Sequence, residues 1–160
     1  MCWASVLLDA WIRNALSPYP IAESDLAMTP NVVGKSSHYA LSVADGSGKP
    51  FDGAKTYRLN IPRQVGTAAL WSVVLYDPST RAELQTCHVN PTKTGQRESL
   101  IVNVDGSVDL YFGPKAPAGK EANWTATIPN KSWYALFCLE GPVEPWFDKT
   151  WWPSKFEVLE

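Results

Sequence analysis

Short stretches in which apolar and polar residues alternate dominate the middle of the chain, as in strands that bury one face. The stretch 56–61 places Tyr57, Leu59 and Ile61 on one side and polar residues on the other. The stretch 108–112 alternates in the same way. We therefore predict a half-buried strand in each.

A third alternating stretch, residues 100–104, is joined to 108–112 through Asp105-Gly106. Asp-Gly is a strong hairpin signal because both residues tolerate the positive φ of a tight turn. This arrangement predicts a β-hairpin in which residues 100–104 form the first strand.

More uniformly apolar stretches are typical of central strands, and we predict two of them, at 70–76 and 133–140, buried on both sides. The first strand of the sheet region is predicted at 38–43. A further strand is predicted at 82–89, followed by a polar loop over 90–99.

The two ends of the chain follow other patterns. Within residues 1–16 the apolar positions recur at helical spacing; they are Trp3, Leu7, Leu8, Trp11, Ile12 and Ala15. This predicts an amphipathic helix that docks on the domain's own core, or alternatively on a partner domain or another subunit. The tail 143–160 is rich in aromatic residues and proline. It is predicted to lie over the core as an extended strap.

These elements predict a mainly β fold, an antiparallel β-sandwich of jelly-roll-like type with an N-terminal amphipathic helix and an aromatic C-terminal strap. We assign residues 1–25 to the N-terminal helix and linker and residues 26–160 to the β-sandwich domain. At 160 residues, the chain is long enough for one sizeable core.

Charge and composition exclude several classes of function. The net charge is −2 and basic residues are scattered, so no electrostatic footprint for nucleic acid is present. No apolar run reaches the roughly 20 residues of a membrane span, and no basic region precedes the N-terminal one. We expect neither a membrane span nor a signal peptide, and a cytoplasmic location. The 3 cysteines and 2 histidines are widely spaced, so we expect no metal site and no cofactor.

Several motifs occur in a defined order along the chain. They are Pro50-Phe51-Asp52-Gly53, Leu70-Trp71-Ser72-Val73, Tyr76-Asp77, the stretch from Asp105 to Trp124, Gly141-Pro142 and Phe147-Asp148-Lys149-Thr150-Trp151. Over roughly residues 26–156 the chain resembles domain of unknown function 1214. Proteins of that family usually carry domain of unknown function 1254 ahead of it. The resemblance implies a β-sandwich that is the C-terminal half of a two-domain plan, with an N-terminal partner domain.

Two stretches fail as catalytic motifs. Gly113 to Lys120 has the wrong glycine spacing for a phosphate loop, and Glu121 stands where such a loop needs Ser or Thr. Cys87 and His88 are neighbours that would point to opposite faces of a strand, so the imidazole could not take the thiol proton.

Carboxylate and aromatic residues give better candidates. Asp109 and Tyr111 share the strand face opposite the apolar one, where Tyr76 or Arg81 could approach if the two strands pair. A polar cluster among aromatic rings is what a small-molecule pocket needs, although the same pattern also fits a solvent-facing sheet. The candidate catalytic residues are Tyr76, Asp109 and Tyr111, and the candidate ligand-binding residues are Trp71, Tyr76, Arg81, Tyr111 and Trp124.

The sequence therefore favours a β-sandwich module that binds a small apolar ligand or docks a partner domain or an identical subunit. The alternative is a cofactor-independent enzyme, such as a cyclase, isomerase or hydrolase, that acts on an apolar small molecule in an aromatic-lined pocket. Whether the chain is an enzyme is left open by the sequence.

Overall fold

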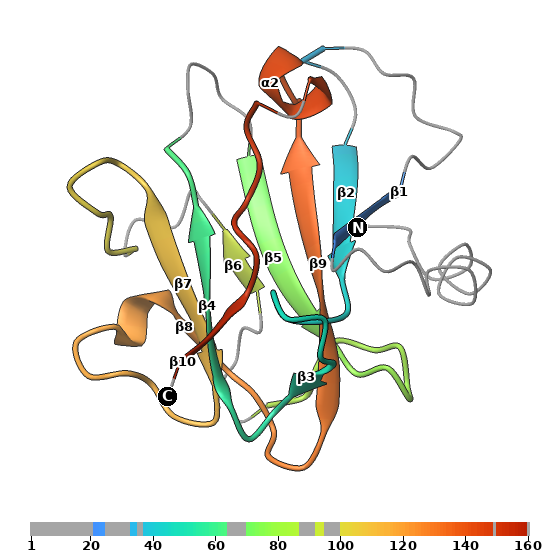
Figure 1. Ribbon diagram of the computed structural model, residues 1–160, viewed down its shortest axis with the longest axis vertical. Helices are drawn as coiled ribbons and strands as arrows, with labels where there is room; N and C mark the ends of the chain where they lie inside the picture. The colour runs from blue at the N-terminus through green and yellow to red at the C-terminus, as the bar shows by residue number, and fades with distance from the viewer. Residues whose placement is uncertain are drawn as a thin grey trace.

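Two β-sheets form the framework of the described part of the chain (Figure 1). The structure is a computed structural model that describes residues 21–24, 33–34, 37–63, 70–86, 92–94, 100–148 and 150–159. The predicted N-terminal helix, Cys2, Cys87 and His88 lie outside these residues. No helix among the described residues has the length and apolar character needed to cross a membrane.

The larger sheet has six strands and is organised around one long central strand. This strand, β9 (Ser132–Glu140), pairs along its length with two antiparallel neighbours. A short third strand pairs with its N-terminal end. In spatial order the sheet contains β1 (Ile21–Ser24), β2 (Ser37–Ser42), β9, β5 (Leu70–Tyr76) and β6 (Thr92–Thr94), with β3 (Phe51–Asp52) paired to β9 beside this path.

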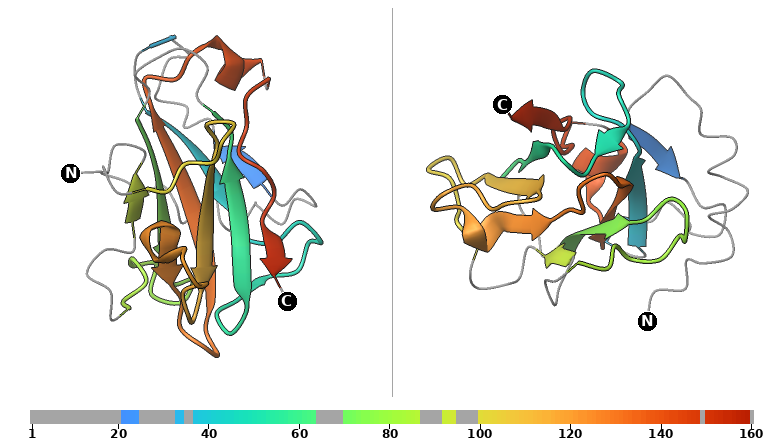
Figure 2. Two further views of the ribbon diagram at one scale, coloured as in Figure 1. Left: turned by 90° about the vertical axis from the view of Figure 1, so that its left-hand side faces the viewer. Right: turned by 90° about the horizontal axis from the view of Figure 1, so that it is seen from below.

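The smaller sheet has four strands and carries the second half of the core. Its order is β10 (Glu157–Leu159), β4 (Thr56–Ile61), β7 (Val108–Gly113) and β8 (Trp124–Ala126). The pairs β10–β4 and β4–β7 are antiparallel, whereas β7 and β8 run parallel. Figure 2 shows both sheets from the side and from below.

One hydrophobic core joins the two sheets, which gives a sandwich-like, mainly β architecture as predicted. Because side chains alternate along each strand, each sheet turns one set of residues toward the other. The smaller sheet contributes Tyr57, Leu59, Ile61, Leu110 and Phe112, and the larger one Ala40, Trp71, Val73, Leu75, Trp133, Ala135, Phe137 and Leu139.

Aromatic rings fill the end of the core nearest β3. Phe51 stacks on Trp133 with ring centroids 4.0 Å apart and nearly parallel planes. Tyr57 and Phe156 pack edge-on against Phe51. Since Phe156 comes from the tail, this aromatic group ties the C-terminal residues to both sheets.

The tail runs beside β4 after a short helix, α2 (Glu144–Phe147). Elsewhere in the chain, a short 3-10 turn, η1 (Glu121–Asn123), precedes β8. Two hydrogen bonds join Ser154 to the Asn60 backbone: the Ser154 amide donates to the Asn60 carbonyl, and the Ser154 hydroxyl accepts from the Asn60 amide. Trp146 of α2 stacks on Trp152 at 4.3 Å.

The predicted hairpin over 100–112 is wrong in its first half. Residues 100–107 form a loop, although a turn does occur at Asp105-Gly106, where Gly106 has a φ of +85°. The hydrogen bonds of a partner strand are replaced by one side chain: Asn123 accepts from the Ile101 amide and donates to the Ile101 carbonyl, both at 2.7 Å. Val102 and Val104 are consequently exposed instead of facing the core.

The remaining strand predictions agree well with the structure, with three corrections. The stretch 70–76 is a strand but is fully buried on one face only. Residues 82–86 form no strand and contribute an isolated bridge between Glu83 and Tyr76. The predicted polar loop 90–99 contains β6.

The stacked rings should dominate stability at this end of the sandwich. We predict that Phe51→Ala lowers the free energy of unfolding by about 3–5 kcal/mol, because it removes a fully buried ring and leaves a cavity between the sheets. Urea denaturation followed by tryptophan fluorescence measures the change. Val104→Ala is the control and should change stability by no more than about 0.5 kcal/mol, since Val104 is fully exposed.

Candidate functional site

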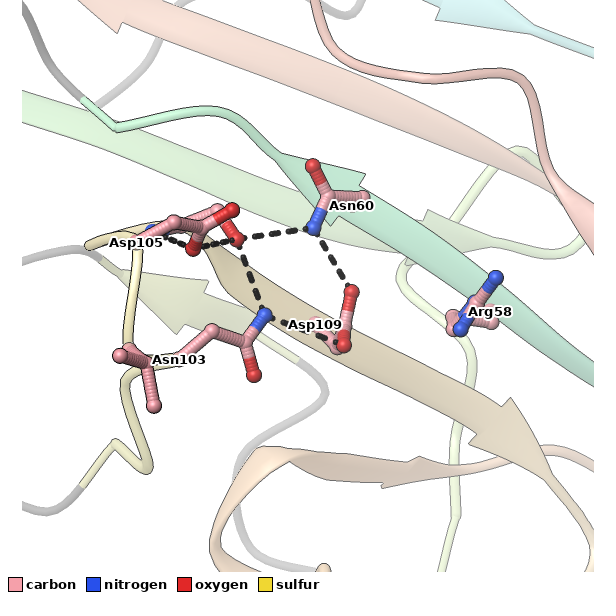
Figure 3. A pocket seen from close by; sticks show the side chains of 7 residues that line it. Arg58, Asn60, Asn103, Asp105 and Asp109 are labelled. Atoms are coloured by element: carbon pink, nitrogen blue, oxygen red, sulfur yellow. Dashed lines mark hydrogen bonds between the residues drawn. The ribbon is translucent and has the colours of Figure 1, made fainter.

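A groove with a volume of about 530 Å³ lies on the outer face of the smaller sheet (Figure 3). It is open to solvent and is formed by β4, β7 and the loop 100–107. Its lining residues are Arg58, Asn60, Asn103, Val104, Asp105, Ser107 and Asp109.

Strand register places the central pair of the groove. Asn60 on β4 lies directly opposite Asp109 on β7. Both residues point away from the core because their neighbours Leu59 and Leu110 point into it. Amide and carboxylate therefore meet on the outer face of the sheet.

Hydrogen bonds fix this pair from both sides. One Asp109 oxygen, Oδ1, accepts from Asn60 Nδ2 at 2.8 Å, and the other, Oδ2, accepts from Asn103 Nδ2 at 3.1 Å. The Ser107 hydroxyl accepts from the same two amide nitrogens, at 3.2 Å from Asn60 and 2.9 Å from Asn103. The floor of the groove is thus arranged by internal hydrogen bonds before any ligand arrives.

The turn at the rim of the groove is held by Asp105. Its Oδ1 accepts from the Ser107 hydroxyl at 2.7 Å and from the Ser107 amide at 2.9 Å. These two hydrogen bonds hold the pKa of the Asp105 carboxyl below its ordinary value of 3.8. The resulting contribution to stability is complete above pH 3.8 and is lost as the pH falls through the lowered pKa.

Asn123 anchors the loop to the sheet. Besides pairing with Ile101, its Nδ2 donates to the Asp109 backbone carbonyl at 2.8 Å. The Asn123 side chain is almost completely buried. One buried amide therefore links the loop wall of the groove to the strand that carries Asp109.

Arg58 forms the opposite wall of the groove. Its guanidinium donates to Glu157 of β10, which raises the pKa of Arg58. Both side chains are well exposed, so this ion pair adds little to stability. Because Glu157 balances Arg58, the carboxylates of Asp105 and Asp109 give the groove a net negative charge.

The structure separates the predicted catalytic residues. Asp109 and Tyr111 lie together on β7, on the outer face of the smaller sheet. Tyr76 lies on β5 in the other sheet and stacks on Tyr134 on that sheet's outer face, with centroids 5.3 Å apart. The assumed pairing of their two strands does not occur, because β7 pairs with β4 and β8. Tyr76 therefore cannot join Asp109 in one site.

The predicted ligand-binding residues are divided in the same way. Trp71 is a core residue that stacks on Phe137. Arg81 is exposed in the turn after β5, with a φ of 58°, and lies on the other sheet's side of the molecule. Tyr111 and Trp124 are register partners on β7 and β8, beside Arg58.

Six of the seven groove residues were not among the sequence candidates, namely Val104 and five polar or charged residues: Arg58, Asn60, Asn103, Asp105 and Ser107. A signal for them was present, since polar residues recur at every second position from Asn103 to Asp109. The polar face of the stretch 56–61 was a signal for Arg58 and Asn60. What could not be obtained from the sequence was the pairing that brings these two stretches together.

A second cluster covers the outer face of the larger sheet. It consists of Leu41, Tyr134 and Leu136, with Tyr39 and Tyr76 packed against them. The Tyr134 hydroxyl is buried and has no hydrogen-bond partner among the described residues. Burial, and to a smaller extent the neighbouring Tyr76, raises the pKa of Tyr134 to about 12.

The core contains an apolar cavity of only about 20 Å³, bordered by Leu59, Val73, Phe137 and residues of the tail. This volume is close to that of a single water-sized sphere, so it cannot hold an apolar ligand. Among the described residues, no group of three or more His, Cys, Asp or Glu side chains could hold a metal ion.

Two sheets packed face to face define a β-sandwich protein, and this one carries a groove on one outer face. The chain belongs to the family described as Protein of unknown function (DUF1214), whose family model matches residues 36–144. This confirms the family resemblance seen in the sequence. No curated protein is significantly similar to the chain.

At least one solved structure shares the fold. The VPA0106 protein from Vibrio parahaemolyticus is 17% identical over 78% of this chain, with a TM-score of 0.66. An uncharacterized protein from Burkholderia cenocepacia is 23% identical over 79% of this chain, with a TM-score of 0.44. This chain spans only 31% of the length of each of them.

The unpartnered hydroxyl of Tyr134 allows a matched pair of substitutions. We predict that Tyr134→Phe leaves the free energy of unfolding unchanged or raises it by up to about 1 kcal/mol, because a buried hydroxyl without a partner is unfavourable. Tyr57→Phe should lower it by about 1 kcal/mol, because the hydroxyl of Tyr57, a residue buried as fully as Tyr134, accepts a hydrogen bond from the Asp52 amide at 2.9 Å. Urea denaturation of both variants measures the difference, and equal losses would contradict the prediction.

Proposed function

We propose that this chain is a binding module that holds a small polar ligand in the groove between β4, β7 and the loop 100–107. The observation that carries the proposal is the hydrogen-bonded floor formed by Asn60, Asn103 and Asp109. Side chains that are already fixed lose little conformational entropy when a ligand binds. The volume of about 530 Å³ falls in the usual range for small-molecule sites.

The lining of the groove favours a polar ligand over the apolar one that the sequence suggested. Six of its seven residues have polar or charged side chains, and Val104 is the exception. An apolar ligand would displace water from these groups without replacing its hydrogen bonds, which is unfavourable. The apolar cavity in the core is too small to serve instead.

The alternative of a cofactor-independent enzyme receives less support from the geometry. Of its three candidate residues, Tyr76 lies in the other sheet. Both carboxylate oxygens of Asp109 already accept hydrogen bonds from amide groups. A general acid or base needs a partner within hydrogen-bond reach of the reacting proton, and the three candidates supply no such pair.

A screen of small polar fragments tests the binding module. NMR detects binding through changes in the backbone and side-chain amide signals. We expect fragments to shift the signals of Asn60, Asn103 and their neighbours. Asp109→Asn should weaken this binding about tenfold or more, because the amide nitrogen that replaces one carboxylate oxygen only donates and cannot accept the hydrogen bond from Asn60 or Asn103 at that position. The matched control is Asp148→Asn beside α2, a carboxylate away from the groove lining that also accepts hydrogen bonds, here from the Thr150 amide and hydroxyl. If no fragment shifts the groove signals, or if both variants behave alike, the proposal is wrong.

Docking of another protein surface is a second candidate function, favoured by exposed apolar residues on the same loop. Ile101, Val102 and Val104 are all exposed. The matched VPA0106 chain is about three times as long as the segment that this chain covers. We infer that the loop lies at a contact with a partner domain, such as domain of unknown function 1254, or with an identical subunit.

Light scattering and native mass spectrometry test the subunit version of this proposal. The chain should show a mass that rises with concentration, and the double substitution Val102→Lys and Val104→Lys should abolish the rise, because burying two ammonium groups opposes association. Val33→Lys is the control, since Val33 is also exposed but lies away from the loop in the sequence. A chain that remains monomeric at every concentration would contradict docking between subunits.

A further inference from the structure

The groove contains both hydrogen-bond acceptors and hydrogen-bond donors that its internal hydrogen-bond network does not use. Asn60 and Asn103 each direct Nδ2 toward Asp109, and their carbonyl oxygens point away from this network (Figure 3). Among the described residues these two oxygens and Asp105 Oδ2 accept no hydrogen bond. Arg58 has further N–H donors besides the one that Glu157 accepts.

This combination discriminates between ligand classes. A ligand that only accepts hydrogen bonds, such as a phosphate or carboxylate, would face Asp105 and Asp109 and be repelled. A ligand that only donates, such as an ammonium group, would leave the Arg58 guanidinium without a new partner. A hydroxyl group can donate to the amide and carboxylate oxygens and accept from the guanidinium.

We propose that the groove binds a polyhydroxylated ring, a sugar or cyclic polyol, and this inference rests on the proposed function of the groove. Neighbouring hydroxyls of such a ring are spaced to reach two side-chain groups at once. The Asn60–Asp109 pair and Arg58 lie on consecutive outward positions of the same two strands. They therefore present acceptors and donors side by side.

The rim of the groove suits the apolar side of a sugar ring. Val104 lines the groove and is completely exposed in the free chain. A pyranose carries C–H groups as well as hydroxyls, so one part of the ring can cover Val104 while the hydroxyls reach the polar floor. This contact would remove an exposed apolar side chain from water.

The test uses NMR titration of the whole chain with defined probes, observing the side-chain amide signals of Asn60 and Asn103. The polyol probes are D-glucose, D-mannose, D-galactose and myo-inositol. The matched probe is tetrahydropyran-2-methanol, which keeps the ring and loses the ring hydroxyls. We expect at least one polyol to bind about tenfold or more tightly than the matched probe, because a site built for hydroxyls rejects a ligand that lacks them.

Variants and competing probes complete the design. Asn103→Ala should weaken polyol binding about tenfold or more, whereas Asp148→Asn should leave it unchanged. Putrescine and calcium chloride test binding to the negative charge of the groove alone. Tighter binding of either than of every polyol would overturn the inference.

The outcomes separate this inference from the proposed function. If polar fragments shift the groove signals but no polyol binds better than tetrahydropyran-2-methanol, the ligand class is wrong and the binding module stands. If neither fragments nor polyols shift them, both are wrong. Thermal denaturation of each variant shows whether a loss of binding reflects the site or the fold.

Discussion

The register between β4 and β7 is the constraint on which both the core and the groove depend. It sets Leu59 against Leu110 on the inner face and Asn60 against Asp109 on the outer face. A slip of one residue would exchange the two faces of a strand, which would bury the polar groups and expose the leucines. The fully buried leucines thus hold the polar pair in place, because a shift of either strand that moved Asn60 or Asp109 would also move a leucine out of the core.

Asn123 extends this constraint to the loop 100–107, which pairs with no strand among the described residues. Its side chain supplies the hydrogen bonds that a neighbouring strand would give to Ile101, and it also binds the backbone of Asp109. An amide can do this because it carries a donor and an acceptor in the same geometry as a peptide group. The loop 100–107 is consequently attached to β7, and the exposed valines on it border the groove.

The local pattern in the sequence predicted most strands but not their partners. Residues 56–61 and 133–140 alternate or run apolar in ways that indicate strands directly. The stretch 100–104 has the same alternation, yet Asn123 replaces the partner strand there. Pairing is a long-range property, so the sequence offered Tyr76 or Arg81 as neighbours of Asp109 on the condition that their strands pair, whereas the actual neighbour is Asn60. The polar face that carries Asn60 was visible, whereas its position beside Asp109 needed the structure.

The internal hydrogen bonds of the groove set a limit on its chemistry. Because Asp109 and Ser107 are already satisfied by the two asparagines, a ligand gains most from the groups that remain, namely the amide oxygens, Asp105 and Arg58. In the free chain these groups are bonded to water, so each ligand hydroxyl exchanges one hydrogen bond for another and adds only a modest free energy. Selectivity in such a groove comes from how many of these groups one ligand can satisfy together, because each group left unpaired opposes binding.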